Sequence, residues 1–191
     1  DFSTAAGFHP ALGQAIAAWV ARHRKQVVSG SRLARRWHLI EIGAGTGDLA
    51  LAVLRSLPWR ARRGLTYYIV ETSPHLAALQ QRLLAGRRVC WHQEPSAAVE
   101  QAGGTALIFS NELVDAFPAV ILRSDGQQWQ EVYLEPDGEH FREVPGPCRA
   151  DTLKRIEAEQ PSVWDSAWRQ RAGQQVEVHL AYAAWLRTWV P

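Results

Sequence analysis

Three glycines at alternate positions, Gly43, Gly45 and Gly47, constrain the fold of this chain more than any other feature. They follow a short apolar run over residues 37–42, which is typical of a buried parallel strand, and they precede a helical pattern over 48–57. Glycine has no Cβ, so such a turn can adopt positive φ and let a ligand approach the backbone closely. Parallel sheets bind ligands at the carboxyl ends of their strands. The motif therefore predicts an α/β fold with a ligand-binding turn after its first strand.

The pattern of strands and helices extends this prediction. Apolar, β-rich runs alternate with amphipathic segments, which indicates a parallel sheet built by right-handed crossovers. We expect a Rossmann-like sheet of order 3-2-1-4 with helices on both faces. The predicted strands after the first are 66–70, 88–92 and 106–110, and the predicted helices are 8–28, 48–57, one beginning at Ser73-Pro74, and 96–101.

After Pro118 the sequence no longer alternates between strand and helix patterns. Asp125-Gly126 and Asp137-Gly138 are turn signals that predict antiparallel hairpins, and helices are expected over 151–159 and 176–189. We expect a core domain over 1–118, a hairpin and helix insertion over 119–175, and a helix over 176–191 that leads into a further part of the core. A fourth strand left as an apolar edge is an aggregation liability, and the chain contains no methionine. Both observations predict a truncated piece of a longer enzyme.

Two acidic residues distinguish the glycine turn from a dinucleotide site. Glu41 ends the first strand, where it would repel a pyrophosphate but attract the cationic amino acid portion of S-adenosylmethionine. Glu71 ends the second strand, where a carboxylate can accept hydrogen bonds from both ribose hydroxyls. The G-x-G-x-G spacing also lacks the last glycine of a dinucleotide fingerprint. We therefore predict S-adenosylmethionine as cofactor, against the alternative that the glycines form a structural turn and the carboxylates are solvated.

Four segments resemble the MidA-like family of class I methyltransferases. They are Asp1-Phe2-Ser3-Thr4-Ala5, the glycine motif with Glu41, the segment from Tyr68 to Pro74 with Leu76 and Gln80 after it, and "SNELVDAFP" at 110–118. Trp129-Gln130-Glu131 resembles the W-x-E hairpin of the same family. In that family a helix like 177–189 is followed by a strand with an aspartate-tyrosine-glycine motif, which is missing here. The mitochondrial members of that family methylate a protein arginine, so the resemblance implies this activity as an expectation. It also implies that Phe2 and Thr4 close over the cofactor.

Asn111, Glu112 and Asp115 are the candidate catalytic residues, because they follow the fourth strand, whose carboxyl end should face the transferring methyl group. A guanidinium needs carboxylates to orient it, so we assign substrate orientation to Glu112 and support to Asp115. The alternative is that Asn111 and Asp115 cap a turn while Glu112 bonds backbone amides. Gln93 is a candidate adenine contact, or else an ordinary loop residue.

Composition excludes several other classes of function. A net charge of +2 predicts no nucleic-acid partner, and the arginine bias is interpreted as genomic composition and not as a binding patch. No apolar run approaches the roughly 18 residues of a membrane span, and no signal peptide is visible, so we expect a cytoplasmic protein without membrane association. Cys90, Cys148 and the scattered histidines fit no metal spacing. Tryptophans 19, 185 and 189 are expected in the core, and Trp129 is a candidate contact for a substrate or a partner.

The leading hypothesis for function is a protein arginine N-methyltransferase that acts on a partner protein. A small-molecule methyltransferase and a non-catalytic assembly factor that binds the cofactor are the alternatives.

Overall fold

The computed structural model describes residues 10–28, 36–159 and 171–190. The chain divides into two compact units, which we call unit 1 (Asp1–Asp115) and unit 2 (Ala116–Pro191). Each unit has its own sheet, and each is described by itself.

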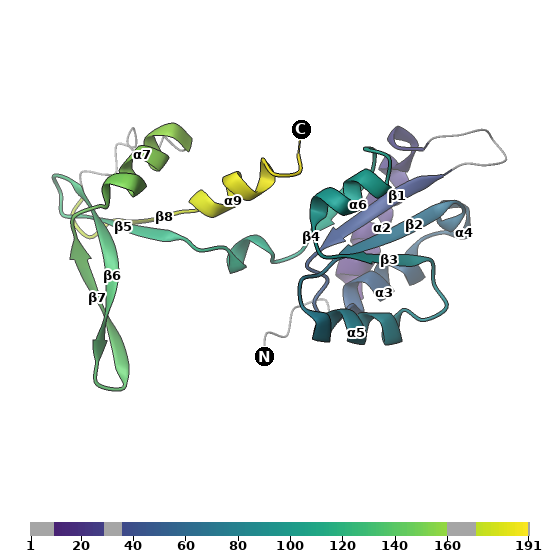
Figure 1. Ribbon diagram of the computed structural model, residues 1–191, viewed down its shortest axis with the longest axis horizontal. Helices are drawn as coiled ribbons and strands as arrows, with labels where there is room; N and C mark the ends of the chain where they lie inside the picture. Colours follow the sequence, from purple (N-terminus) through teal and green to yellow (C-terminus); the bar gives the residue numbers. More distant parts are fainter. Residues whose placement is uncertain (1–9, 29–35, 160–170, 191) are drawn as a thin grey trace. The chain divides into compact units, whose positions relative to one another are not determined.

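The sheet of unit 1 is parallel, with the strand order β3-β2-β1-β4 that the sequence predicts (Figure 1). The strands are β1 (Trp37–Ile42), β2 (Leu65–Val70), β3 (Val89–His92) and β4 (Leu107–Ser110). β1 and β2 are buried along almost their whole length, as expected of central strands covered on both faces.

Helices cover both faces of this sheet, so the predicted α/β fold is confirmed. The helical segments of unit 1 are α2 (Ala11–His23), η1 (Arg24–Gln26), α3 (Asp48–Ser56), α4 (Trp59–Arg62), α5 (Pro74–Leu83) and α6 (Pro95–Gln101). Trp37 and Leu39 of β1 share one core with Ala17 of α2 and Val53 of α3. Ile40 and Ile42 point to the opposite face because side chains alternate along a strand, and α6 contacts the sheet; Figure 1 shows α6 in front of the strands and α2 behind them.

Local signals set two helix starts in unit 1. Ser73 caps α5, since its hydroxyl accepts a hydrogen bond from Leu76 N–H at 3.3 Å, and Pro74 occupies the first helical position, as predicted. The one-turn helix α4 was not predicted. It forms because the Pro58 carbonyl accepts hydrogen bonds from Ala61 and Arg62 N–H, a contact that no sequence period reveals.

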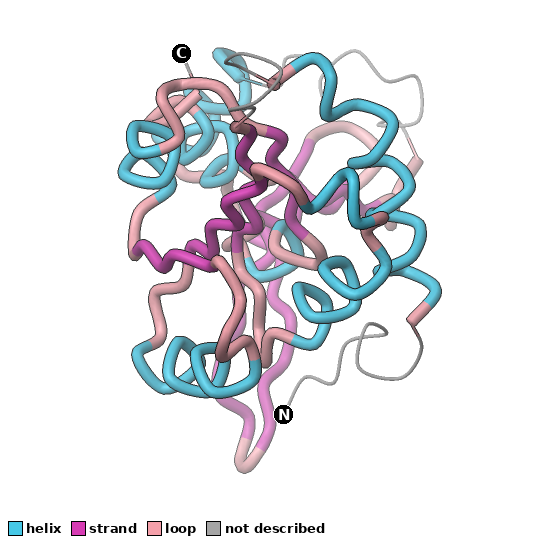
Figure 2. The backbone as a smooth tube through the Cα atoms, turned by 90° about the vertical axis from the view of Figure 1, so that its right-hand side faces the viewer, coloured by secondary structure: helices cyan, strands magenta, loops and turns pink. Residues whose placement is uncertain are grey.

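Unit 2 contains an antiparallel sheet of order β7-β6-β5-β8. Its elements are β5 (Val120–Ser124), β6 (Trp129–Asp137), β7 (His140–Gly146), α7 (Ala150–Glu159), β8 (Gln175–Val178) and α9 (Leu180–Leu186). Both predicted hairpins are confirmed, and the long β6–β7 hairpin ends at its Asp137-Gly138 turn (Figures 1 and 2). The small core of this unit includes Leu122, Trp129, Ile156 and Val178.

The predicted helix over 176–189 is wrong in its first part. Gln175–Val178 form strand β8 and pair with β5, and the helix begins only at Leu180. Val178 is buried while Glu177 is exposed, which is the period of two expected of a half-buried strand. The apolar residues that follow hid this short alternation in the sequence. The expected domain limits at 118 and 175 stay predictions.

Two predictions about tryptophans are corrected. Trp129 is buried in the core of unit 2, which leaves little of its indole for a substrate. Trp19, expected in the core, is 40% exposed on α2. Trp185 and Trp189 are half-buried and pack in an aromatic cluster, in which the Trp185 ring also contacts Phe117.

Candidate cofactor site

The register of the parallel strands brings the predicted cofactor residues to one edge of the sheet. Ile42, the last residue of β1, is paired with Val70 and Ser110, and Val70 is paired with His92. The next residues along the chain therefore emerge side by side. They are Gly43, Glu71, Gln93 and Asn111.

The glycine turn has the backbone that only glycine adopts easily. Gly43, Gly45 and Gly47 have φ of 73°, 55° and 91°. A Cβ on Gly43 would lie 3.0 Å from Leu113 Cδ1, and one on Gly47 would lie 3.1 Å from Gln80 Cγ. A Cβ on Gly45 would meet no atom within 4 Å. The outer two glycines thus allow close packing, whereas the backbone at Gly45 borders open space that a ligand can enter.

Glu41 is a buried carboxylate with one strong hydrogen bond. Its side chain is on the same face of the sheet as Leu39, it is 1% exposed, and the Tyr67 hydroxyl donates to Oε2 at 2.6 Å. Burial raises the pKa of Glu41 to about 7, although the Tyr67 hydrogen bond acts in the opposite direction. Burial also raises the pKa of the Tyr67 phenol, which therefore keeps its proton and donates it. A cation placed at Glu41 would favour the charged carboxylate.

The carboxylate of Glu71 is held on both oxygens. Ser73 N–H donates to Oε1 at 2.9 Å, and Gln80 Nε2 donates to Oε2 at 3.0 Å. Each carboxylate oxygen keeps a further lone pair, so the oriented group can still accept hydrogen bonds from a diol. The half-buried position at the end of β2 fits that role.

Gln80 is the residue of this site that sequence reasoning did not assign. It is completely buried on α5, and besides its bond to Glu71 its Nε2 donates to the Gly45 carbonyl at 2.7 Å. Its Oε1 accepts from Trp91 Nε1 at 3.0 Å. One amide thus joins the glycine turn, the end of β2 and strand β3. The available signal was its place in the segment after Pro74 that resembles the methyltransferase family, although the sequence alone assigned Gln80 no role.

Gln93 and Glu71 line one cavity of about 360 Å³ beside α5 and β3. Thr4 and Phe2, the two predicted cofactor contacts at the start of the chain, lie outside the described residues.

The candidate catalytic residues begin directly after β4. Glu112 has φ of 53° and is the one non-glycine residue with positive φ in the described part of the chain. Asp115 belongs to the short helix η2 (Val114–Ala116), and both carboxylates are exposed. The side chain of Leu113 lies against Gly43, so this segment borders the glycine turn.

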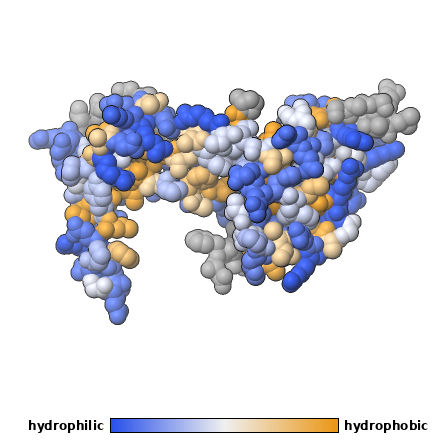
Figure 3. Space-filling model, in the orientation of Figure 1, coloured by the Kyte–Doolittle hydropathy of each residue, from blue (hydrophilic) through white to orange (hydrophobic). Residues whose placement is uncertain are grey.

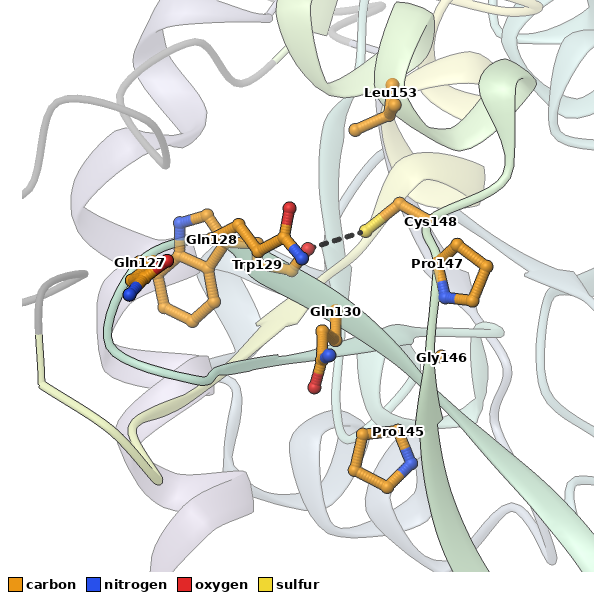
Figure 4. Close-up of a pocket in the computed structure, with 9 residues that line it drawn as sticks. All are labelled: Gln127, Gln128, Trp129, Gln130, Pro145, Gly146, Pro147, Cys148 and Leu153. Carbon is orange, nitrogen blue, oxygen red and sulfur yellow. Dashed lines mark hydrogen bonds between the residues drawn. The ribbon is translucent and has the colours of Figure 1, made fainter.

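A larger cavity of about 740 Å³ lies in unit 2 and contains none of the predicted site residues. Figure 4 shows it between the β6–β7 sheet and α7, where the Cys148 thiol donates to the Trp129 carbonyl at 3.4 Å. Among the described residues, no group of histidine, cysteine and acidic side chains could hold a metal ion. Within the same residues, no helix is long and apolar enough to cross a bilayer.

Comparison with known families gives one match over most of the chain. A family described as "Putative S-adenosyl-L-methionine-dependent methyltransferase" matches residues 15–190. Among curated proteins, the protein arginine methyltransferase NDUFAF7 homolog, mitochondrial, of Caenorhabditis elegans is 24% identical over 161 residues. That alignment covers 73% of this chain and 36% of the relative.

Two solved structures of proteins from Burkholderia thailandensis are similar over 98% of this chain. One, bound to S-adenosyl-homocysteine, has a TM-score of 0.64 at 24% identity, and the chain covers 45% of it. The other, a native structure of an uncharacterized protein, has a TM-score of 0.66 at 26% identity, and the chain covers 47% of it. The chain thus spans about half the length of the solved relatives, and they share its fold.

Proposed function

The chain belongs to this family of S-adenosyl-L-methionine-dependent methyltransferases, and on that premise we propose that it binds S-adenosylmethionine at the carboxyl ends of β1 to β3 and methylates an arginine of a partner protein. The observation that carries the proposal is the joint placement of the glycine turn, Glu41 and Glu71 at one edge of the sheet.

The charges and the space at this edge fit the proposed cofactor. The backbone at Gly45 borders open space, Glu41 would gain from a neighbouring ammonium group, and the two held oxygens of Glu71 would accept from a ribose diol. A pyrophosphate, by contrast, would be repelled by the carboxylates of Glu41 and Glu71.

S-adenosylmethionine supplies an electrophilic methyl group on a sulfonium, so the protein has mainly to position the nucleophile. Glu112 is our candidate for orienting the substrate guanidinium, with Asp115 and Asn111 in support. The backbone at Glu112 has left-handed φ, which costs about 1–2 kcal/mol in a residue with a Cβ. Strain of this kind clusters at functional sites, and it supports a role for this residue beyond ending the strand.

A protein arginine as the substrate is supported by the name of the Caenorhabditis elegans relative and by the chemistry of the segment after β4. Carboxylates orient a guanidinium through paired hydrogen bonds, and two are exposed here.

The first test is calorimetric titration with S-adenosylhomocysteine. We expect micromolar binding that Glu71→Ala weakens by on the order of a hundredfold, since a charge-assisted pair of bonds to the ribose is worth about 1.5–3 kcal/mol. Glu100→Ala, an exposed glutamate of α6, is the matched control and should bind normally, and NAD should give no heat. Equal binding by wild type and Glu71→Ala would refute the cofactor assignment.

The catalytic assignment is tested with radiolabelled S-adenosylmethionine and lysate proteins. Glu112→Gln should reduce label transfer at least about tenfold with S-adenosylhomocysteine affinity unchanged, whereas Glu100→Gln should reduce neither. Equal losses of transfer and affinity would refute the role of Glu112. A labelled metabolite in place of a protein band would indicate a small-molecule substrate, and no transfer at all would indicate a non-catalytic protein.

A further inference from the structure

The charges of unit 1 are separated between the two ends of its sheet. Among the described residues of unit 1, six of the seven acidic side chains follow or end a strand, at the edge that holds the proposed site: Glu41, Asp48, Glu71, Glu94, Glu112 and Asp115. The seventh, Glu100, is near the end of α6. The cations lie at the opposite edge, where the strands begin. The net charge of +2 hides this separation because it sums both ends and both units.

Exposed arginines line the amino-terminal edge of the sheet. They stand directly before β1, in and after α4 before β2, and before β3. We call this set the arginine rim: Arg36, Arg60, Arg62, Arg63, Arg87 and Arg88. Register places the strand starts together, since Trp37 pairs with Leu65, and Tyr67 pairs with Val89. Hydrophilic residues, coloured blue, make up much of the face of unit 1 that Figure 3 shows.

Contacts confirm that the rim is crowded. The Arg24 guanidinium donates to the Arg60 carbonyl at 3.1 Å, which brings the end of α2 to α4. The pKa of His38 is lowered mainly by burial and further by the positive charges of Arg88 and Arg36. Both guanidinium groups therefore lie near the His38 imidazole. In the described part of the chain, every ion pair joins residues of unit 2, and none of them includes an arginine of the rim.

Helix electrostatics account for only part of this pattern. Cations at the last turns of α2 and α5, such as Arg22 and Arg82, are stabilised by the helix dipole. The rim arginines before β1 and β3 are outside any helix, so they gain nothing from it. Gathered like charges repel one another, and an anionic partner would offset that cost.

An exposed tryptophan stands among these arginines. Trp59, the first residue of α4, is 63% exposed, and the Arg60 guanidinium carbon lies 5.5 Å from the centroid of its ring. An indole with a cation beside it suits the head-group layer of a membrane, where the ring contacts acyl chains and the cation meets phosphates. The guanidinium lies over one face of the Trp59 indole, which leaves the other face for stacking of a nucleic-acid base.

We propose that the arginine rim binds an anionic phospholipid surface, with the Trp59 indole at the level of the head groups. This inference goes beyond methyl transfer and does not depend on it. It departs from two expectations drawn from the sequence, that the arginines form no binding patch and that the protein has no membrane association. The second expectation depended on the absence of a spanning segment and of a signal peptide, whereas binding to a membrane surface requires neither. Because the rim is at the amino ends of the strands, a bound lipid surface would leave the carboxyl-end site of unit 1 uncovered.

Vesicle sedimentation tests the proposal on the whole chain. Wild type should sediment with vesicles of phosphatidylcholine and phosphatidylglycerol and not with phosphatidylcholine alone, and added salt should weaken the binding. Each basic residue near an anionic surface contributes substantially, so Arg62→Glu with Arg63→Glu should reduce partitioning about tenfold or more. Trp59→Ser should reduce it about threefold.

Matched variants separate this proposal from the others. Arg171→Glu, an exposed arginine of unit 2, should sediment like wild type. Glu71→Ala should bind S-adenosylhomocysteine weakly and still bind vesicles. The rim variants should lose vesicle binding and still bind S-adenosylhomocysteine, and that retained binding would show that they are folded. Absent binding to anionic vesicles, or equal binding to neutral ones, would overturn the proposal. The proposal would also be overturned if single-stranded RNA bound the protein more tightly than vesicles do, displaced it from them, and required the same arginines.

Discussion

The carboxylate of Glu41 is 1% exposed, and the hydroxyl of Tyr67 is its hydrogen-bond donor. Ionising a buried carboxyl group costs free energy that one hydrogen bond does not recover, which is why its pKa is raised to about 7. The folded protein therefore holds this proton more tightly than the unfolded chain does. The stability that the protonated Glu41 contributes is fully present below about pH 4.5, which is the ordinary pKa of a glutamate. It is lost as the pH rises through the pKa of about 7 in the folded protein.

Glu41→Gln should therefore stabilise the protein without ligand at pH 8 and change little at pH 5. The neutral amide keeps the shape and can still accept from Tyr67, and the expected gain at pH 8 is on the order of 2–3 kcal/mol. Denaturant unfolding at the two pH values measures it. The same variant should bind S-adenosylhomocysteine more weakly, because the ammonium group of the ligand loses the negative charge of the Glu41 carboxylate. A loss of stability at pH 8 would contradict this account of Glu41.

At the scale of elements, the side chain of Gln80 links α5 by hydrogen bonds to the turn after β1 and to strand β3. Its amide satisfies the Gly45 carbonyl, the Glu71 carboxylate and the Trp91 indole N–H together. An unsatisfied buried group costs about 1–3 kcal/mol, so the three partners hold the turn and the acidic residue in one fixed geometry.

Gln80→Leu should lower S-adenosylhomocysteine affinity by roughly tenfold to a hundredfold, because Glu71 and the Gly45 carbonyl lose their common donor. Calorimetry measures this loss, and the circular dichroism of the variant checks its fold. Gln14→Leu, at an exposed position of α2, makes the same chemical change and should bind normally. Unchanged affinity in Gln80→Leu would mean that the glycine turn keeps its shape without this amide.

Sequence reasoning succeeded for elements that carry their own signals and failed where tertiary pairing decides. The strand order follows from alternation and crossover handedness, and Ser73-Pro74 marks a helix start by itself. Strand β8 is only four residues long and exists through its pairing with β5, which no local pattern reports. Likewise, Glu41 and Glu71 were predicted as cofactor contacts from their places at strand ends, and that assignment stays a prediction. Gln80 and Tyr67 make contacts distant in sequence, which local patterns do not report.

At the scale of the whole molecule, the two units have separate hydrophobic cores. The core that contains Leu39 and Val53 lies within unit 1, and the core that contains Leu122 and Ile156 lies within unit 2. The glycine turn, Glu41, Glu71 and Gln80 all belong to unit 1. Since mutational effects at sites without shared partners add independently, a change in the core of unit 2 should leave the proposed cofactor site unaffected.

Ile156→Ala tests this independence. Ile156 is completely buried on α7, and removing its side chain should destabilise unit 2 by about 2–5 kcal/mol through lost burial and a residual cavity. Native-state hydrogen exchange should then show faster exchange of the β5 and β6 amides, with β1 and β2 unchanged, and S-adenosylhomocysteine affinity should match that of wild type. Faster exchange in β1 together with weaker binding would show that the two units unfold as one, and that the cofactor site depends on the sheet of unit 2.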